Sequence, residues 1–232
     1  MSETETPSTV PPPKRERRKE ARPGELLAAA LELFVEKGFA ATRVDEVAQR
    51  AGVSKGTLFL YFPSKEELFK AVVRENISGR FAEWAEVLQT YQGSSADLLR
   101  LAMTQWWERI GSTRASGIPK LVMSEAGNFP ELVQFFHDEV VEPGNQLIRQ
   151  ILQRGVTRGE FRPLDPVYGV YSVIAPMLFL SMWKHSMTPC GSGLNMIDPA
   201  QYMQSQIDTI LHGLLTPSAG APGAGPAHHN PN

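Results

Sequence analysis

Cysteine is almost missing from this chain of 232 residues, in which Cys190 is the one example. A single cysteine excludes an intramolecular disulfide and a cysteine-based zinc site. Residues 1–13 are acidic and rich in proline, and they lack the apolar core of a secretory signal. We therefore expect a protein of the reducing cytoplasm. Cys190 lies among Pro, Gly and Ser residues without an evident base, which favours an inert thiol over a redox sensor.

Catalytic motifs are missing as well. The sequence has no G-x-S-x-G elbow, no glycine-rich phosphate loop and no H-E-x-x-H zinc motif. The triplet His137-Asp138-Glu139 lies on an expected helix, where a solvated polar face is a simpler interpretation than an acid–base pair. We expect no enzymatic activity, no cofactor and no metal site.

Alternating strand patterns and fixed-period repeats are also missing, whereas apolar residues recur at helical spacing through residues 22–215. Leu27, Leu31 and Phe34 belong to one such stripe, which ends at Lys37-Gly38. Thr42 is expected to cap the next helix, and Ser64 begins a capping box that ends at Glu67. These patterns predict an all-α fold. Residues 217–232 predict a disordered tail.

A helix-turn-helix is predicted by residues 44–61. Val47 and Ala48 form the inner face of a short first helix, Gly52 suits a turn that needs positive φ, and Ser54 can cap a second helix. Leu58 then packs inward. A generic corner between two helices is the alternative, and the spacing favours the DNA-binding motif.

The same residues, with Leu33-Phe34, Gly38-Phe39 and the string from Tyr61 to Leu68, closely resemble the DNA-binding domain of the tetracycline-repressor (TetR) family. The resemblance covers about residues 20–80, with the motif at about 43–62. Residues 125–132 weakly resemble the C-terminal domain of members linked to efflux control.

The resemblance implies a homodimer that presents two helix-turn-helix units to a palindromic double-stranded DNA operator. Thr42 and Arg43 would contact phosphate, and the second helix would face the major groove. The residues implied to contact DNA are Thr42, Arg43, Ser54, Lys55, Gly56, Thr57, Tyr61, Phe62 and Lys65. Thr42 and Phe62 also have purely structural interpretations, as a helix cap and as packing beneath Pro63.

A basic arm precedes the first helix, with six cations and two anions in residues 14–22. Such an arm either tracks phosphate or enters the minor groove, or it is a solvated, disordered leader. We assign residues 1–19 to this arm, and we expect disorder there.

The larger half, residues 81–216, contains all four tryptophans and seven of the eight methionines. A soft aromatic interior suits a pocket for a small lipophilic effector, although ordinary core packing is the more common explanation for any single one of these residues. The candidate effector contacts are Trp84, Met103, Trp106, Trp107, Met123, Glu125, His137 and Met177.

A run of 18 residues without charge, 166–183, reaches the length of a membrane helix. Glycine, proline and serine dilute it, and no basic cluster flanks it, so we expect no membrane segment. In the TetR-like interpretation, residues 166–184 and 199–215 pair with their copies as a four-helix dimer interface.

Charge is divided unevenly along the chain. Residues 14–65 hold 11 Lys+Arg against 7 Asp+Glu, whereas residues 66–232 hold 12 against 16. The net charge of −2 therefore averages a basic DNA-facing segment and an acidic larger half. We predict a ligand-responsive DNA-binding regulator, most simply a repressor. The alternative is a dimeric helical small-molecule-binding or scaffold protein with weak, non-specific DNA binding.

Overall fold

The computed structural model describes residues 22–187 and 197–215. Within them every regular element is helical, apart from one isolated antiparallel bridge between Phe161 and Leu215. This confirms the predicted all-α fold. The predicted basic arm, Cys190 and the predicted tail at 217–232 lie outside the described residues.

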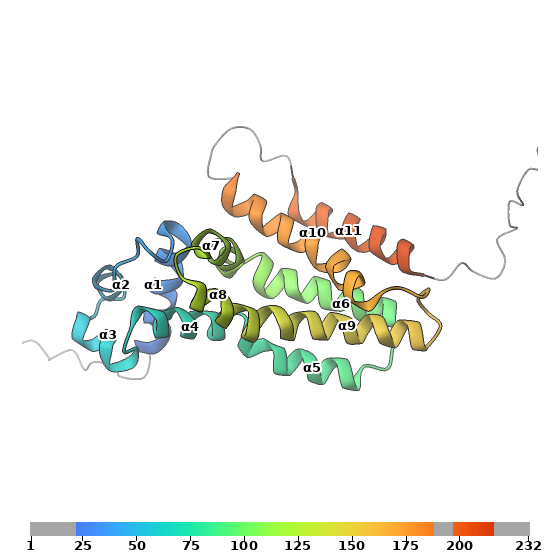
Figure 1. Ribbon diagram of the computed structural model, residues 1–232, viewed down its shortest axis with the longest axis horizontal. Helices are drawn as coiled ribbons and strands as arrows, with labels where there is room; N and C mark the ends of the chain where they lie inside the picture. Colours follow the sequence, from blue (N-terminus) through green and yellow to red (C-terminus); the bar gives the residue numbers. More distant parts are fainter. Residues whose placement is uncertain (1–21, 188–196, 216–232) are drawn as a thin grey trace, which may run out of the picture.

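Four helices form the N-terminal domain at one end of the molecule (Figure 1): α1 (Arg22–Lys37), α2 (Val44–Arg50), α3 (Lys55–Tyr61) and α4 (Lys65–Asn76). The larger domain follows with α5 (Phe81–Thr90), α6 (Ser95–Trp106), α7 (Ile118–Glu125), α8 (Pro130–Phe136), α9 (Glu142–Thr157), α10 (Pro166–Ser186) and α11 (Pro199–Leu214). Single 3-10 turns cover Ser78–Arg80 and Arg114–Gly117, and single π-helical turns cover Trp107–Gly111 and His137–Val141.

The predicted helix starts are mostly confirmed. Ser54 Oγ accepts a hydrogen bond from the Thr57 N–H at 3.1 Å, and Ser64 Oγ accepts one from the Glu67 N–H at 3.1 Å. Thr42 does not cap α2, because Arg43 is the N-cap residue there and makes no side-chain cap. The Thr42 hydroxyl instead lies beside Gly38 O, 2.7 Å away, and Leu33 O, 3.1 Å away, at the end of α1.

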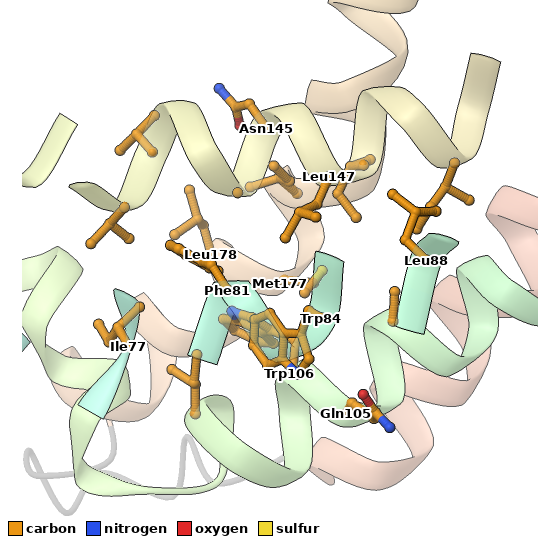
Figure 2. Close-up of a pocket in the computed structure, with 18 of the residues that line it drawn as sticks. Ile77, Phe81, Trp84, Leu88, Gln105, Trp106, Asn145, Leu147, Met177 and Leu178 are labelled. Atoms are coloured by element: carbon orange, nitrogen blue, oxygen red, sulfur yellow. The ribbon is translucent and has the colours of Figure 1, made fainter. Parts of the chain in front are cut away.

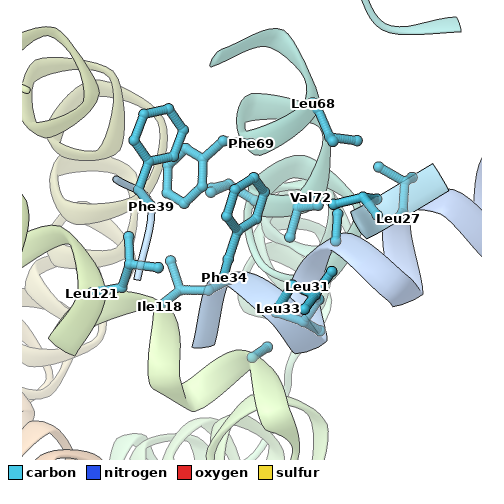
Figure 3. Close-up of a cluster of buried hydrophobic side chains, with 14 of the residues drawn as sticks. Leu27, Leu31, Leu33, Phe34, Phe39, Leu68, Phe69, Val72, Ile118 and Leu121 are labelled. Atoms are coloured by element: carbon cyan, nitrogen blue, oxygen red, sulfur yellow. The ribbon is translucent and has the colours of Figure 1, made fainter. Parts of the chain in front are cut away.

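Two hydrophobic clusters fill the interior. The first begins in the N-terminal domain with residues such as Phe34, Phe39 and Phe69, and it continues into α7 and α8 through Ile118 and Leu132 (Figure 3). The second joins α6, α9, α10 and α11. Because the first cluster crosses from one domain to the other, the N-terminal domain packs directly on the larger domain rather than being joined by a linker alone.

Helix α10 is the most apolar helix in the described part of the chain. By length and composition alone it could cross a membrane, yet it packs against α7, α9 and α11. Val173 and Leu180 are buried in the second cluster. Only 28% of its most apolar window is buried within the chain, so α10 also presents an uncovered apolar face.

Candidate DNA interface and effector cavity

The turn between α2 and α3 has the geometry that its sequence predicts. Gly52 adopts φ +68°, a left-handed conformation that suits glycine and few other residues. The Val53 N–H then donates to Ala48 O at 2.9 Å. Val47 and Leu58 are fully buried, so one apolar contact face locks the two short helices together. The sequence therefore predicted this motif correctly.

Helix α3 presents its first turn to solvent. Lys55 and Gly56 are exposed, and a Cβ added to Gly56 would approach only Ser54 Oγ, at 3.9 Å. The hydroxyls of Ser54 and Thr57 lie 2.9 Å apart. These groups, the positive end of the helix dipole and the free surface around Gly56 suit close approach to a phosphate backbone and to base edges.

Two further exposed residues of α3 escaped the sequence prediction. Leu60 is 85% exposed and Phe59 is 40% exposed, both unusual for large apolar side chains. Leu60 follows Gly56 by one helical turn, so the two share a face. That spacing was the available signal. Apolar side chains in the major groove contact the thymine methyl group.

Asp45 joins the cations of the two motif helices. Its carboxylate lies 3.0 Å from Lys55 Nζ and 3.0 Å from Arg43 Nη2. Hydrogen bonds from Lys55 and then from Arg43 lower the pKa of Asp45 to about 2. The carboxylate is therefore charged at every physiological pH, and it neutralises part of the positive charge that DNA would meet.

Three of the residues implied to contact DNA point inward. Thr42 is 2% exposed. The Lys65 ammonium donates to Phe39 O at 2.9 Å, Ala40 O at 3.2 Å and Thr42 O at 3.2 Å. Phe62 packs against the first hydrophobic cluster. Their side chains hold the domain together, whereas those of Arg43, Lys55 and Tyr61 are exposed.

A cavity of about 230 Å³ lies within the larger domain, bounded mainly by α5, α6, α9 and α10 (Figure 2). Among the predicted effector contacts, Trp84, Trp106 and Met177 line it. Met103 is buried nearby in the second cluster but does not line it. Trp107 borders a second cavity of about 330 Å³, beside Trp183.

Three other predicted effector contacts lie away from this cavity. Met123 is 64% exposed on α7. His137 is exposed and pairs with Asp138 at 3.0 Å. Glu125 Oε1 accepts a hydrogen bond from the Ala40 N–H at 2.9 Å, so it joins α7 to the loop after α1. Composition predicted Met123, and Glu125 and His137 were predicted as its polar partners in the pocket, but none of the three lines the cavity.

The uncovered face of α10 matches the predicted interface segment. Its exposed large apolar residues are Val167, Tyr168, Tyr171 and Phe179. Phe179 also stacks near Tyr202 of α11, with ring centroids 5.9 Å apart. A contiguous apolar face of this kind is typical of a protein–protein contact.

Comparison with known proteins agrees with this geometry. Residues 26–72 match the family described as bacterial regulatory proteins, tetR family, and residues 92–189 match a tetracyclin repressor-like C-terminal domain. The transcriptional repressor KstR2 of Mycolicibacterium smegmatis is 31% identical over 205 residues, covering 86% of this chain and 93% of KstR2. The chain belongs to the TetR family.

Other relatives extend this picture. The transcriptional regulator RutR of Escherichia coli O157:H7 is 30% identical over 169 residues, covering 70% of this chain and 74% of RutR. The structure of the regulator FadR from Bacillus subtilis, in complex with stearoyl-CoA, superimposes with a TM-score of 0.67 at 20% identity, covering 82% of this chain and 98% of FadR. This TetR-family protein is a DNA-binding transcriptional regulator, and its named relatives are described as transcriptional regulators.

Proposed function

We propose that a homodimer of this chain binds a palindromic operator through α3 and releases it when a small lipophilic effector fills the α5–α6–α9–α10 cavity. The observation that carries this proposal is the exposed first turn of α3, held by a buried motif core. That core is continuous with the walls of the cavity. The protein would act in the cytoplasm, where bacterial DNA is accessible.

The DNA contacts divide into positioning and reading groups. Arg43, the N-cap residue of α2, and Tyr61, the last residue of α3, are both exposed and are placed to contact phosphates and set the orientation of the domain. Lys55, Thr57 and Leu60 are placed to reach base edges in the major groove. Thr42, Phe62 and Lys65 support this surface from below. We assign Ser54 to capping α3, with its hydroxyl still exposed.

The dimer would form through α10 and α11. Tyr168 is 73% exposed and Tyr171 is 55% exposed in the single chain, and pairing with a second copy would remove both from water. A two-fold dimer presents two α3 helices, so the operator's symmetry would follow the symmetry of the protein.

The cavity and the DNA-binding domain share packed residues. Ile77, Ile110 and Phe136 line the cavity and also belong to the first hydrophobic cluster. The 3-10 turn that ends at Gly117 makes a second contact between the two domains. Its backbone lies so close to α1 that a Cβ on Gly117 would be 2.6 Å from the Val35 side chain. An effector that repacks the cavity walls would therefore shift the N-terminal domains and favour the DNA-free state.

Selection of bound sequences from random DNA duplexes tests the proposal. We expect a palindrome whose two half-sites lie one helical turn or a multiple of it apart. Lys55→Ala should weaken binding to that palindrome and reduce the salt slope by about 2, one for each copy of the chain in the dimer. Arg149→Ala, on α9 of the larger domain, is the control that should change neither. Weak binding without sequence preference would instead support a scaffold or binding protein.

We also propose that the arm, residues 1–19, contributes phosphate contacts to the complex with DNA. Its cations precede α1 directly in the sequence. Deleting residues 1–19 should lower affinity for the selected palindrome at low salt and lower the salt slope. An unchanged salt slope would mean that the arm makes no phosphate contacts.

A further inference from the structure

The cavity walls carry no formal charge. Within the described part of the chain, its lining contains no Asp, Glu, Lys, Arg or His. Polar side chains are few: Gln105 and Asn145 contribute amides, Ser116 a hydroxyl and Tyr171 a phenol. An ion enters such a site only with a large desolvation penalty, because no counter-charge waits for it there.

One lining residue has an unused hydrogen-bond donor. The indole Nε1 of Trp84 is buried and has no acceptor within hydrogen-bond distance in the described structure. Buried indole N–H groups usually find a partner, so a lone one is costly. Figure 2 shows the Trp84 and Trp106 rings among the side chains that enclose the cavity. Trp84 therefore brings an unpaired donor to the lining of the effector site, and a small shift of the neighbouring side chains would open that donor to a bound ligand.

Asn145 provides a second polar group in the same wall. It is 7% exposed, and its side-chain amide makes no hydrogen bond to any described residue. It comes from α9, whereas Trp84 comes from α5. Ser116 differs from both, because its hydroxyl already pairs with Thr113 O at 2.8 Å and His185 Nε2 at 2.8 Å.

The lining residues also indicate the shape of the site. On α5 they extend from Phe81 to Leu88, and on α10 from Tyr171 to Leu178. At ~1.5 Å of rise per residue, both stretches are roughly 10 Å long. A volume of about 230 Å³ spread over such a length is narrow. It suits an extended hydrocarbon part rather than a bulky one.

We infer that the effector is an uncharged, extended hydrocarbon molecule with one carbonyl-type acceptor, which receives a hydrogen bond from the Trp84 indole N–H. This inference rests on the proposed function and specifies its ligand. The acceptor is an ester, ketone or thioester oxygen. A carboxylate is excluded by the uncharged wall, unless its charge stays outside the cavity.

Four probes of equal chain length test the inference by calorimetric titration into the full-length protein: methyl octanoate, octanoate at pH 8, octane and octanoyl-CoA. Methyl octanoate should bind about tenfold or more tightly than octanoate, because the ionised group would lose its water without a partner. It should also bind more tightly than octane. Octanoyl-CoA distinguishes a thioester effector from a free neutral one. If it binds about as tightly as the ester, the effector is a thioester whose charged part stays outside the cavity. If it does not bind, the effector is a free neutral compound.

The variant Trp84→Phe keeps an aromatic ring but removes the donor. Its affinity for methyl octanoate should fall roughly 2- to 10-fold, while its affinity for octane stays unchanged. Trp107→Phe, outside this cavity, is the matched control and should leave both affinities unchanged. If Trp84→Phe does not fold, the preference of the wild-type protein for the ester over octane still tests the donor.

The possible failures are distinguishable. Octanoate binding as tightly as the ester would overturn the uncharged class, and an ester affinity equal to that of octane, or unchanged in Trp84→Phe, would overturn the role of the donor. If a palindrome is selected but no probe binds, the inference fails while the regulator function stands. If the ester binds but no DNA sequence is selected, the proposed function fails instead.

Discussion

The Lys65 ammonium donates to the carbonyl oxygen of Phe39 at 2.9 Å and lies 4.4 Å from the centre of the Phe39 ring. The same ammonium also bonds Ala40 O and Thr42 O, both at 3.2 Å. One side chain at the start of α4 thus satisfies three carbonyl groups in the loop after α1. Lys65 is a structural cation that holds the motif's first helix in place.

Lys65→Met should therefore destabilise the fold. The methionine keeps the length of the side chain but removes the donor from Ala40 O and Thr42 O, whereas Phe39 O keeps its bond from the Thr42 N–H at 3.3 Å. The cost should be about 1–3 kcal/mol in the free energy of unfolding. Urea unfolding followed by circular dichroism measures the change. Lys55→Met, an exposed cation with one ion pair, should change stability by less than about 1 kcal/mol. If the Lys65→Met protein keeps wild-type stability and loses only DNA affinity, Lys65 contacts a DNA phosphate and is not needed to hold the loop.

The contrast between Lys65 and Lys55 shows how far the sequence alone reaches. The helix-turn-helix core could be predicted, because Val47, Gly52 and Leu58 have fixed spacings that burial and positive φ require. The direction of a long side chain could not. Lys65 turns inward because its neighbours in space are carbonyls from a loop that lies more than 20 residues earlier.

The cavity shows the same limit in another form. Aromatic and sulfur content predicted a soft interior, and the structure places Trp84, Trp106 and Met177 around one cavity. Met123 has the same composition signal but lies on an outer face, and so does His137, which was predicted as a polar contact. Helical spacing says which residues share a face, whereas the face that meets the cavity depends on how several helices pack together.

Asp45→Asn should strengthen operator binding. Asp45 neutralises Lys55 and Arg43 at 3.0 Å each and repels phosphate itself, so its removal frees two cations. We expect affinity to rise roughly 2- to 10-fold at low salt, with a steeper salt dependence. Titration of the selected duplex at several salt concentrations measures both.

The matched control for that variant is Glu46→Gln, because Glu46 pairs with Lys37 at 3.0 Å rather than with α3. It should change the salt slope little. The low pKa of Asp45, about 2, keeps the carboxylate charged above pH 4. Its charge therefore stays constant between pH 5 and 8 and adds no pH dependence to wild-type binding in that range. Weaker DNA binding by Asp45→Asn would mean that the carboxylate positions Lys55 productively.

Tyr168→Asp should separate the proposed dimer. The side chain is 73% exposed on α10, so a single chain tolerates the change, whereas a paired copy would bury the new carboxylate without a partner. Light scattering at micromolar concentration should report the mass of a monomer, and operator binding should fall with it. Tyr168→Phe keeps the ring and should remain dimeric. A dimeric Tyr168→Asp protein would place the interface elsewhere.

The unfolding free energy of the protein should decrease in mild acid because of the buried side chain of His185. Its Nε2 lies 2.8 Å from Ser116 Oγ. Burial, followed by the nearby charges of Lys184, Lys120 and Arg114, lowers its pKa from 6.5 to about 4. Between these two values the unfolded chain binds a proton that the folded chain refuses, so stability falls as pH decreases from 6.5 toward 4.

His185→Gln keeps a polar partner for Ser116 but cannot take up the proton, so its unfolding free energy should fall less across the same pH range. Below about pH 4 the folded histidine is also protonated, and the two curves should run parallel again. Urea unfolding at half-unit pH steps measures this difference, with the exposed His137→Gln as the control. Identical pH profiles for wild type and His185→Gln would show that His185 takes up its proton as readily in the folded chain as in the unfolded one.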